Sequence, residues 1–199
     1  MFKSYNFDQK ENDPQNYYFY EEGFNKEELS TIYKGIQSLE ENKADTIGSN
    51  SNEVRSSKVR WIPQNDGWHW LYEKLSDMIS TANNTLWNFD LTHIPEQIQY
   101  TEYYATEKGH YTWHQDIGPG MLSKRKISIT VQLSGPEEYE GGDLEVFTGG
   151  NYKEGDFIKS PKGMGTVFIF PSYLLHRVTP VTKGIRRSFV LWVGGSPYR

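Results

Sequence analysis

Residues 125–133 read RKISITVQL, and apolar and polar side chains alternate along this stretch. Alternation with a period of two predicts a β-strand with one apolar face and one polar face. The polar face carries Ser128, Thr130 and Gln132, which either line a pocket or face solvent. The stretch therefore predicts one strand of a sheet that packs on a core.

Similar short stretches lie on both sides of this strand. Segments rich in glycine and proline, such as Gly118-Pro119-Gly120 and Gly141-Gly142, separate them. Short strands at this spacing are typical of a β-sandwich or barrel. The candidate strands are 97–104, 111–115, 126–133, 143–147, 165–170, 174–181 and 185–193.

The N-terminal half contains two stretches with helical periodicity instead. Asn25 and Glu28 form a capping box, and apolar residues then recur at helical spacing, which predicts a helix over 26–41. A second helix is expected over 66–86, with Asp66 as its N-cap. Both helices should pack against one outer face of the β core. The sequence thus predicts a mainly β protein with flanking helices, of the α+β class.

Two other N-terminal segments are expected to lie outside these helices. Residues 1–24 predict an irregular arm or a short edge strand. Residues 42–58 are polar and contain glycine and serine, which is typical of a long surface loop that serves as a lid or binding loop. We find no repeat and no linker, so we expect one domain over 1–199. Within it, 1–96 supplies the arm and supporting helices and 97–195 the β core.

The composition favours a folded protein in spite of its low hydropathy. Hydrophobic residues make up 36% of the chain and mean hydropathy is −0.74, but 15% of residues are aromatic, and large rings can fill a core. There is no cysteine, which excludes disulfides, a thiolate zinc site and a cysteine nucleophile. Any metal must therefore be bound by histidine, carboxylate or water.

Charge and hydropathy patterns restrict the partners and the compartment. The net charge is −5 and the pI about 5.6, which argues against a non-specific nucleic-acid binder. No apolar run approaches the length of a membrane span, and residues 1–16 are too polar for a signal peptide. We expect a cytoplasmic protein that binds neither nucleic acid nor membrane. The sequence does not define its oligomeric state.

Two histidines and one aspartate form a candidate metal site. His114 and Asp116 lie two residues apart on a strand or at its end, so both side chains point to the same side. His176 lies in VFIFPSYLLHRVTPV, an apolar stretch that predicts a strand buried on both faces. Taken singly, each could be an ordinary surface or core residue. Together they match the triad of two histidines and one carboxylate that leaves positions of an iron(II) ion open for oxygen.

Arg186 is the second element of this site. A hairpin turn at Lys183-Gly184 would place it on the strand next to that of His176. Ser188 lies two residues further on, on the same side. The arginine guanidinium can donate two parallel hydrogen bonds to a carboxylate, and serine can add one more. The pair therefore suits the distal carboxylate of a dicarboxylate cosubstrate. The alternative, an exposed arginine in a salt bridge, is the role expected for Arg187, which points the opposite way.

Three segments carry a resemblance to a known family. They read YYATEKGHYTWHQD, RKISITVQLSGPEEYEGGDLEVF and FPSYLLHRVTPVTKGIRRSFVLW. In them the chain resembles the double-stranded β-helix oxygenases that depend on Fe(II) and 2-oxoglutarate, nearest to the prolyl 4-hydroxylase-like branch and the PKHD-type hydroxylases. The resemblance covers residues 97–195. It implies a jelly-roll, cupin-like core supported by the two N-terminal helices.

The resemblance also implies roles for single residues. The equivalents of the two histidines and the aspartate bind iron, and the equivalent of Arg186 binds the C5 carboxylate of 2-oxoglutarate. Tyr104 falls where these enzymes often place a tyrosine near the cosubstrate. The family often has another tyrosine near the position of Gln132, and here Gln132 is expected to donate in its place.

The implied reaction is a hydroxylation that consumes 2-oxoglutarate and O2 and releases succinate and CO2, with ascorbate as a candidate reductant. Residues 53–62 resemble the Arg-Ser-Ser stretch of prolyl 4-hydroxylases, which contributes to a mobile peptide-binding loop. A peptide or protein substrate is therefore expected, with peptidyl proline first, since aromatic rings beside arginine suit an extended peptide. Core packing is the alternative for Tyr111 and Trp192, and a solvated loop is the alternative for Arg55 and for Lys58. The residues expected to contact substrate are Arg55, Ser56, Ser57, Tyr111, Arg125 and Trp192.

Other functions fit parts of the sequence. A 2-oxoglutarate oxygenase acting on a free amino acid or small metabolite would use the same residues. A metal hydrolase or isomerase on a cupin-like barrel would use the triad without the cosubstrate, and Arg186 would then bind a substrate acid. A non-enzymatic β-sandwich that binds ligands would explain the aromatic content, but it gives no reason for the triad and Arg186 to occur together.

Overall fold

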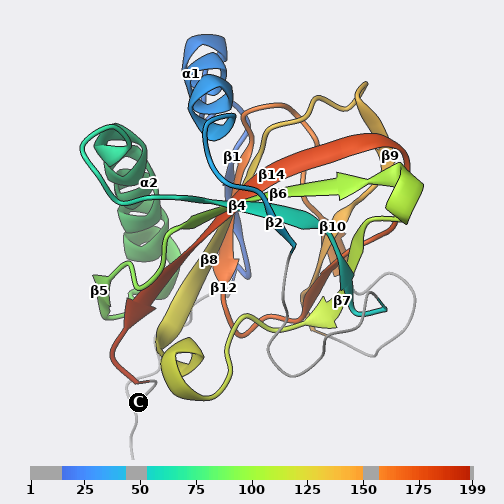
Figure 1. Ribbon diagram of the computed structural model, residues 1–199. Helices are drawn as coiled ribbons and strands as arrows, with labels where there is room; N and C mark the ends of the chain where they lie inside the picture. The colour runs from blue at the N-terminus through green and yellow to red at the C-terminus, as the bar shows by residue number, and fades with distance from the viewer. Residues whose placement is uncertain (1–14, 44–52, 150–156, 198–199) are drawn as a thin grey trace, which may run out of the picture.

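Two antiparallel β-sheets form the centre of the molecule, and two helices lie outside the larger one (Figure 1). The structure is a computed structural model and describes residues 15–43, 53–149 and 157–197. Apolar side chains from both sheets meet between them, which makes the jelly-roll core expected from the sequence. The mainly β architecture with flanking helices is thus confirmed.

The larger sheet has nine strands. In spatial order its path is β1 (Tyr18–Tyr20), β12 (Val167–Pro171), β8 (Arg125–Gln132), β14 (Val181–Gly195), β6 (Ile98–Tyr104), β4 (Lys58–Ile62) and β2 (Asn42–Lys43). Two short strands, β5 (Leu91–His93) and β9 (Tyr139–Gly141), pair with β14 off this path.

The smaller sheet has five strands. In order they are β11 (Phe157–Lys159), β10 (Leu144–Phe147), β13 (His176–Val178), β7 (His110–His114) and β3 (Arg55–Ser56). Short 3-10 turns, Ala105–Glu107 and Gly120–Lys124, link β6 to β7 and lead into β8.

The alternation along β8 decides which way each side chain points. Ile127, Ile129 and Val131 pack into the core under the helices, on what we call the outer face of the larger sheet. Ser128 and Thr130 point to the inner face, toward the smaller sheet, where they line a cavity. All of β8 is buried, so the expectation that its polar face lines a pocket holds for these two residues and the exposed-face alternative is wrong.

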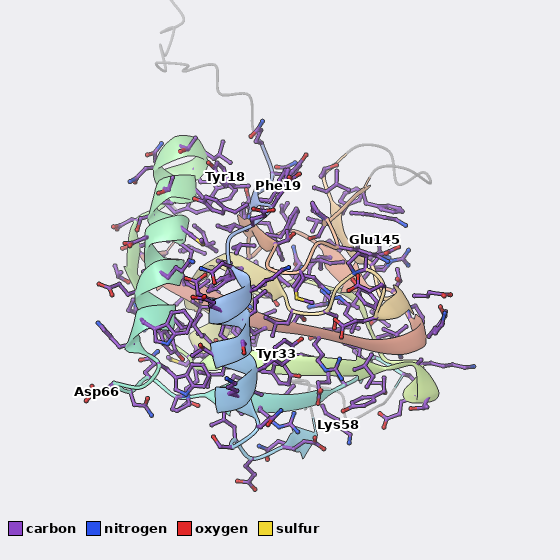
Figure 2. All side chains as sticks on the ribbon, turned by 90° about the horizontal axis from the view of Figure 1, so that it is seen from above. Tyr18, Phe19, Tyr33, Lys58, Asp66 and Glu145 are labelled. Atoms are coloured by element: carbon purple, nitrogen blue, oxygen red, sulfur yellow. The ribbon has the colours of Figure 1, made fainter. Side chains whose placement is uncertain are left out.

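Two helices cover the outer face. They are α1 (Lys26–Ile36) and α2 (His69–Ala82), and in Figure 2 α2 lies along one side of the molecule while Glu145, on the smaller sheet, lies along the other. The side chain of Asn25 accepts hydrogen bonds from the backbone of Glu27 and Glu28, as the capping box predicts. Neither described helix combines the length and the apolarity that crossing a membrane requires.

The start and end of the second helix differ from the prediction. Its N-cap is Trp68, which makes no side-chain capping bond, and Asp66 contributes only its backbone carbonyl, which accepts from the N–H of His69. Asp66 as N-cap was therefore wrong. After Ala82 the chain continues into a π-helical turn, Asn83–Trp87.

The predicted loop 42–58 is largely β structure where it is described. Its ends form β2, β3 and the beginning of β4, while 44–52 lies outside the described residues, as does the 1–14 part of the predicted arm. The polar residues, glycine and serine of this segment predicted a loop, and the charged side chains at its end, Lys58 and the neighbouring Arg60, lie on β4 instead. Both are paired with Glu41, so their charges are compatible with a strand.

The turn before Arg186 was also misplaced. Lys183 and Gly184 lie inside β14, and the connection from β13 passes through Thr179 and Pro180. Gly184 has φ of +70° and bends the strand where a Cβ would overlap the carbonyl oxygen of Glu138. Arg186 and His176 consequently lie on opposite sheets, facing each other across the cavity, rather than on neighbouring strands.

Candidate metal and cosubstrate site

The structure brings His114, Asp116 and His176 together. His114 ends β7 and His176 begins β13, and the two residues are directly paired across these antiparallel strands. The Nε2 atoms of His114 and His176 lie 3.7 and 3.4 Å from the two carboxylate oxygens of Asp116. One ligand atom from each residue lies within 4.8 Å of the other two.

Backbone carbonyls orient both imidazole rings. Nδ1 of His114 lies 2.7 Å from the carbonyl oxygen of Thr112, and Nδ1 of His176 lies 2.8 Å from that of Leu174. A carbonyl only accepts, so Nδ1 carries the proton in each ring and Nε2 keeps its lone pair. Both lone pairs are therefore available on the side of Asp116, as metal ligation requires.

The electrostatics of the triad favour this protonation state. Burial, together with the neighbouring His176, lowers the pKa of His114 to about 3. Burial alone would raise the pKa of Asp116, but the two histidines and a hydrogen bond from Ser128 hold that pKa below its usual range. Ser128 donates to Oδ2 at 2.6 Å. At neutral pH the site thus offers the neutral imidazole of His114 and the carboxylate of Asp116, with Nε2 of His176 beside them.

These donors fit an octahedral divalent ion. Neighbouring ligands about 2.1 Å from such an ion lie about 3 Å apart, so small side-chain movements would close the observed separations of 3.4 and 3.7 Å. Three protein ligands from one side leave the remaining positions open, and the absence of sulfur ligands suits non-haem iron(II). The role of the three residues as iron ligands stays a prediction that this geometry supports.

A cavity of about 500 Å³ between the two sheets contains the triad at one end. Arg186 and Ser188 line it from β14, and Thr130 from β8. From β6 it receives three residues that the sequence analysis did not name. They are Gln99, Thr101 and Tyr103.

Arg186 is a buried cation without a carboxylate partner in the described part of the chain. Its side chain is 3% exposed, Nη1 donates to the Ser188 hydroxyl at 3.2 Å, and the guanidinium lies 5.6 Å from the ring centroid of Tyr103. A buried charge is normally paired, and leaving it unpaired is unfavourable. Arg186 and Ser188 therefore fit the distal carboxylate of a diacid. Arg187, by contrast, pairs with Glu102 on the outer face, as expected.

Two predicted cosubstrate residues lie outside the cavity. Tyr104 faces outward, and its hydroxyl donates to Glu102 at 3.0 Å, so its neighbour Tyr103 takes the inner face. Successive side chains on a strand point to opposite faces. Because both positions are tyrosine, the sequence did not indicate which of the two points into the cavity. Gln132 points inward but donates both amide protons elsewhere, to the carbonyl oxygen of Ser134 and the hydroxyl of Tyr139.

Four of the six predicted substrate residues line the cavity. They are Arg55, Tyr111, Arg125 and Trp192. Ser56 and Ser57 are buried but do not line it, and Ser57 instead accepts a hydrogen bond from Arg55 at 2.9 Å.

Arg125 is already neutralised. It donates two hydrogen bonds of 2.7 Å to the carboxylate of Glu96, a third to the backbone oxygen of Asp116, and stacks 3.7 Å from the ring centroid of Trp192. This partner explains why a buried arginine is tolerated there, and the sequence offered no signal for it, because Glu96 lies 29 residues away. Arg125 contacts the turn that carries Asp116 rather than offering a free charge to substrate.

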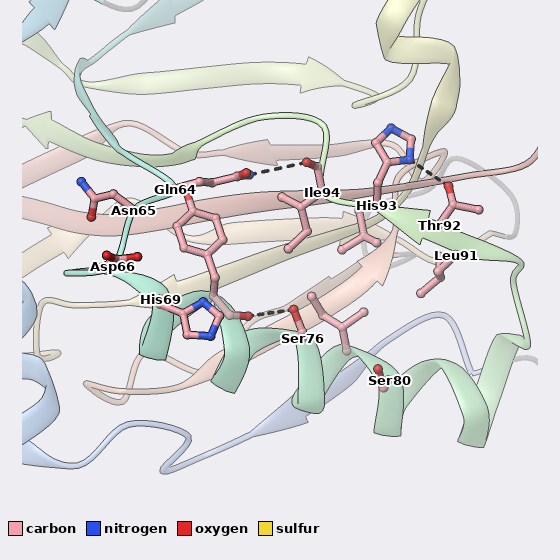
Figure 3. Close-up of a pocket in the computed structure, with 13 residues that line it drawn as sticks. Gln64, Asn65, Asp66, His69, Ser76, Ser80, Leu91, Thr92, His93 and Ile94 are labelled. Carbon is pink, nitrogen blue, oxygen red and sulfur yellow. Dashed lines mark hydrogen bonds between the residues drawn. The ribbon is translucent and has the colours of Figure 1, made fainter.

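A second cavity, of about 710 Å³, lies on the outer face between α2, β5 and the end of β14 (Figure 3). Its polar groups bond to each other: Gln64 to the carbonyl of Ile94, Ser76 to that of Tyr72, and Thr92 to the ring of His93. It contains two histidines but no cluster of metal ligands among the residues described. It lies away from the triad.

Comparisons with known proteins agree with this site. Residues 98–194 match the model of the 2OG-Fe(II) oxygenase superfamily. The matched segment includes the complete triad and Arg186. By this match the segment 98–194 is of the 2OG-Fe(II) oxygenase type. One similar relative, a PKHD-type hydroxylase from Synechococcus sp. (strain JA-2-3B'a(2-13)), is 42% identical over 74 residues, which cover 37% of this chain and 30% of the relative. The chain therefore matches less than a third of that relative's length.

Solved structures of superfamily proteins share the fold. A prolyl hydroxylase from Trichoplax adhaerens, in complex with a hypoxia inducible factor peptide fragment, has a TM-score of 0.73 at 18% identity, covering 90% of this chain and 84% of that one. A prolyl-4-hydroxylase from Pseudomonas putida has a TM-score of 0.68 at 18% identity, covering 90% and 92%. At this identity the likeness establishes the double-stranded β-helix and leaves the substrate undetermined.

Proposed function

We propose that the protein hydroxylates a C–H bond of a peptide or protein residue, with peptidyl proline as the first candidate. The reaction would consume 2-oxoglutarate and O2 and release succinate and CO2, with ascorbate as the candidate reductant. The match to the superfamily model supports the oxygenase chemistry. The names of the relatives support a hydroxylase, and the substrate rests on the residues at the cavity.

One observation carries the proposal: the triad and an unpaired, buried Arg186 share one cavity. A metal hydrolase or isomerase would use the same triad, and Arg186 would then bind an acid group of its substrate. The unpaired guanidinium adds a requirement for an acidic ligand that reaches from the metal to the far end of the cavity. A diacid with a keto group beside one carboxylate meets both requirements.

Bound iron(II), 2-oxoglutarate and O2 would supply the oxidative chemistry. The chain would supply the rest. The carbonyls of Thr112 and Leu174 keep both Nε2 atoms unprotonated for ligation. Arg186 and Ser188 would orient the diacid through its distal carboxylate. The buried walls from β8, β12 and β14 would exclude water from the reacting atoms.

The rim of the cavity supports a peptide substrate. Trp61 and Tyr111 line it as aromatic surfaces, and Arg55 lies 4.8 Å from the ring centroid of Tyr111. The Arg55 guanidinium donates to the neutral oxygens of Gln99 and Ser57, so it retains charge for a carbonyl or carboxylate of the substrate. Aromatic surfaces beside hydrogen-bond donors suit an extended, proline-containing chain.

The test begins without any substrate. Purified protein loaded with iron(II) should bind 2-oxoglutarate anaerobically, with the weak visible absorption of the chelate, and should release succinate slowly in air. A library of peptides is then screened for faster succinate release, with mass spectrometry detecting the gain of one oxygen atom. Omitting ascorbate tests its role as reductant.

The outcomes separate the alternatives. Oxygen added to a free amino acid but to no peptide would favour the metabolite hydroxylase. Binding of iron without any consumption of O2 that depends on 2-oxoglutarate would favour a hydrolase or isomerase. Failure to bind either iron or 2-oxoglutarate would contradict the oxygenase and leave a ligand-binding module.

A further inference from the structure

The side chain of Thr101 has an unusual environment for a buried hydroxyl. It is 1% exposed, lies in the wall of the triad cavity, and its Oγ1 has no hydrogen-bond partner in the described structure. Buried hydroxyls are nearly always bonded, because an unsatisfied one loses its hydration without compensation. An orphan group on a cavity wall is therefore expected to meet its partner when a ligand binds.

The strand register shows which part of the ligand Thr101 would meet. On the inner face, Thr101 of β6 is directly opposite Ser188 of β14. Arg186 is two residues along β14 from Ser188, so it is the diagonal neighbour of Thr101, within about 7–8 Å between backbones. Thr101 thus belongs to the Arg186 end of the cavity rather than to the metal end, where Trp192 and Ser128 face each other.

Ser188 links the two. Its hydroxyl accepts the hydrogen bond from Nη1 of Arg186, so its own proton is free to be donated into the cavity. The Thr101 hydroxyl, directly opposite Ser188 on β6, also has a proton that no described residue accepts. Two hydroxyl donors and one guanidinium fork therefore surround the same space.

The residue expected from sequence to assist Arg186 is not free to do so. Gln132 lies opposite Ser188 on the other side, but both protons of its Nε2 are used, by the Ser134 carbonyl and by the Tyr139 hydroxyl at 3.1 Å. Thr101, from the strand on the opposite side of β14, pairs with the same Ser188 and has a hydroxyl that none of the described residues occupies.

We infer that Thr101 is a cosubstrate-binding residue: its hydroxyl donates to the distal carboxylate of the diacid that Arg186 and Ser188 hold. This inference rests on the proposed function. It assigns to β6 the hydrogen bond that sequence reasoning assigned to Gln132 of β8. It also makes affinity depend on the distal carboxylate, and not on the keto acid end of the ligand.

The test compares two ligands that differ only in that carboxylate, 2-oxoglutarate and 2-oxopentanoate. Affinities are measured by calorimetry with Mn(II)-loaded protein, where no turnover occurs. Thr101→Val keeps the shape and removes the hydroxyl, and should raise the Kd for 2-oxoglutarate about tenfold or more, as expected for a hydrogen bond to a charged group. Its Kd for 2-oxopentanoate should not change. Thr101→Ser should restore 2-oxoglutarate binding.

Thr92→Val is the matched control, since Thr92 lies in the second cavity and its hydroxyl bonds to His93. Without ligand, Thr101→Val should unfold at or above the wild-type temperature, because it removes an unsatisfied group. Should that variant fold poorly, Thr101→Ala tests the same ligand selectivity.

Three results would overturn the inference. Unchanged 2-oxoglutarate binding in Thr101→Val would remove Thr101 from the cosubstrate site while the proposed function stood. Equal losses for both ligands would mean that the variant damages the cavity generally. If wild-type protein bound no 2-oxoglutarate at all, the proposed function itself would fail and the inference with it.

Discussion

Glu102 and Arg186 are both buried charged side chains on neighbouring strands, and they face opposite sides of the larger sheet. Glu102, 6% exposed on the outer face, accepts hydrogen bonds from Arg60, Arg187 and two tyrosine hydroxyls at 2.9–3.2 Å. Arg186, 3% exposed on the inner face, has one serine hydroxyl and no carboxylate among the residues described.

This difference in partners distinguishes a charged residue that stabilises the fold from one that is suited to bind a ligand. A buried charge surrounded by its own partners holds strands together and needs nothing from outside. A buried charge without a counter-charge is unfavourable in the free protein and is explained by a ligand that completes it. The two cavities differ in a similar way. In the outer one Gln64, Ser76 and Thr92 have hydrogen-bond partners, whereas the inner one contains Arg186 and Thr101.

The largest effect should come from removing a metal ligand on the inner face. His176→Ala deletes one of three donors, and a pair of ligands should not hold iron(II) in this geometry. Bound iron and substrate-dependent succinate release should both fall to background, measured by metal analysis and by succinate quantification. Asp116→Ala should behave in the same way.

His93→Ala provides the control for that loss. His93 lies in the outer cavity, where its ring bonds to the Thr92 hydroxyl. Iron content and turnover should stay at wild-type values. If His176→Ala retained full turnover, or if His93→Ala lost it, the distinction between the two cavities would be wrong.

Arg186→Met should have the next largest effect, on the cosubstrate. Methionine is similar in length and uncharged, so the diacid loses its counter-charge, and the Kd for 2-oxoglutarate should rise at least about a hundredfold. Stability without ligand should not fall, because an unpaired buried charge has been removed. Calorimetry and urea unfolding measure the two quantities. A large loss of stability with unchanged affinity would show that Arg186 is structural.

Glu102→Gln should give the opposite pattern. The amide keeps the shape but removes the buried carboxylate that Arg60 and Arg187 share, and leaves them only the more exposed Glu41 and Glu138. The free energy of unfolding should therefore fall by about 2 kcal/mol, as expected when hydrogen bonds to a charged group are lost. Affinity for 2-oxoglutarate should change little, since Glu102 faces away from the cavity. Urea unfolding and the same calorimetry provide the measurements. Lower affinity at unchanged stability would break the contrast between the two faces.

The sequence predicted the parts of this site that local spacing determines. Arg186 and Ser188, two residues apart, share one face of β14, and His114 and Asp116, two residues apart at the end of β7, both line the cavity. The alternation in RKISITVQL likewise separated the apolar from the polar face of β8, although it left open whether the polar face lines a pocket. In these segments the two-residue period of a strand determines which side chains share a face.

Other features depended on partners distant in sequence. In IQYTEYY, large and polar residues occupy both alternating sets, so nothing local indicated that Thr101 and Tyr103 point inward while Tyr104 points to Glu102. Gln132 could be assigned to a face but not to its bond with Tyr139. The pairing of Arg125 with Glu96 across 29 residues was beyond local reasoning for the same reason.

The smallest predicted effect concerns acid and His114, on the inner side of the cavity. An unfolded chain protonates histidine near pH 6.5, whereas the folded pKa of His114 is lowered to about 3. Above pH 6.5 the ring is neutral in both states. As the pH falls below 6.5, the unfolded chain binds a proton that the native protein does not, so metal-free protein should lose stability progressively toward pH 3.

Between pH 7.5 and 5 this loss should be on the order of 1–2 kcal/mol, measured by urea unfolding of metal-free protein. The pKa of Glu102 lies below its usual range, because hydrogen bonds from Arg60 and the two tyrosines outweigh the effect of burial, so Glu102 should not contribute above pH 5. His114→Gln cannot titrate there and should show a flatter profile. Equal slopes would mean that His114 is protonated in the native state. His114 would then have to lose a proton before it could bind a metal, and the site would not be preorganised for metal binding.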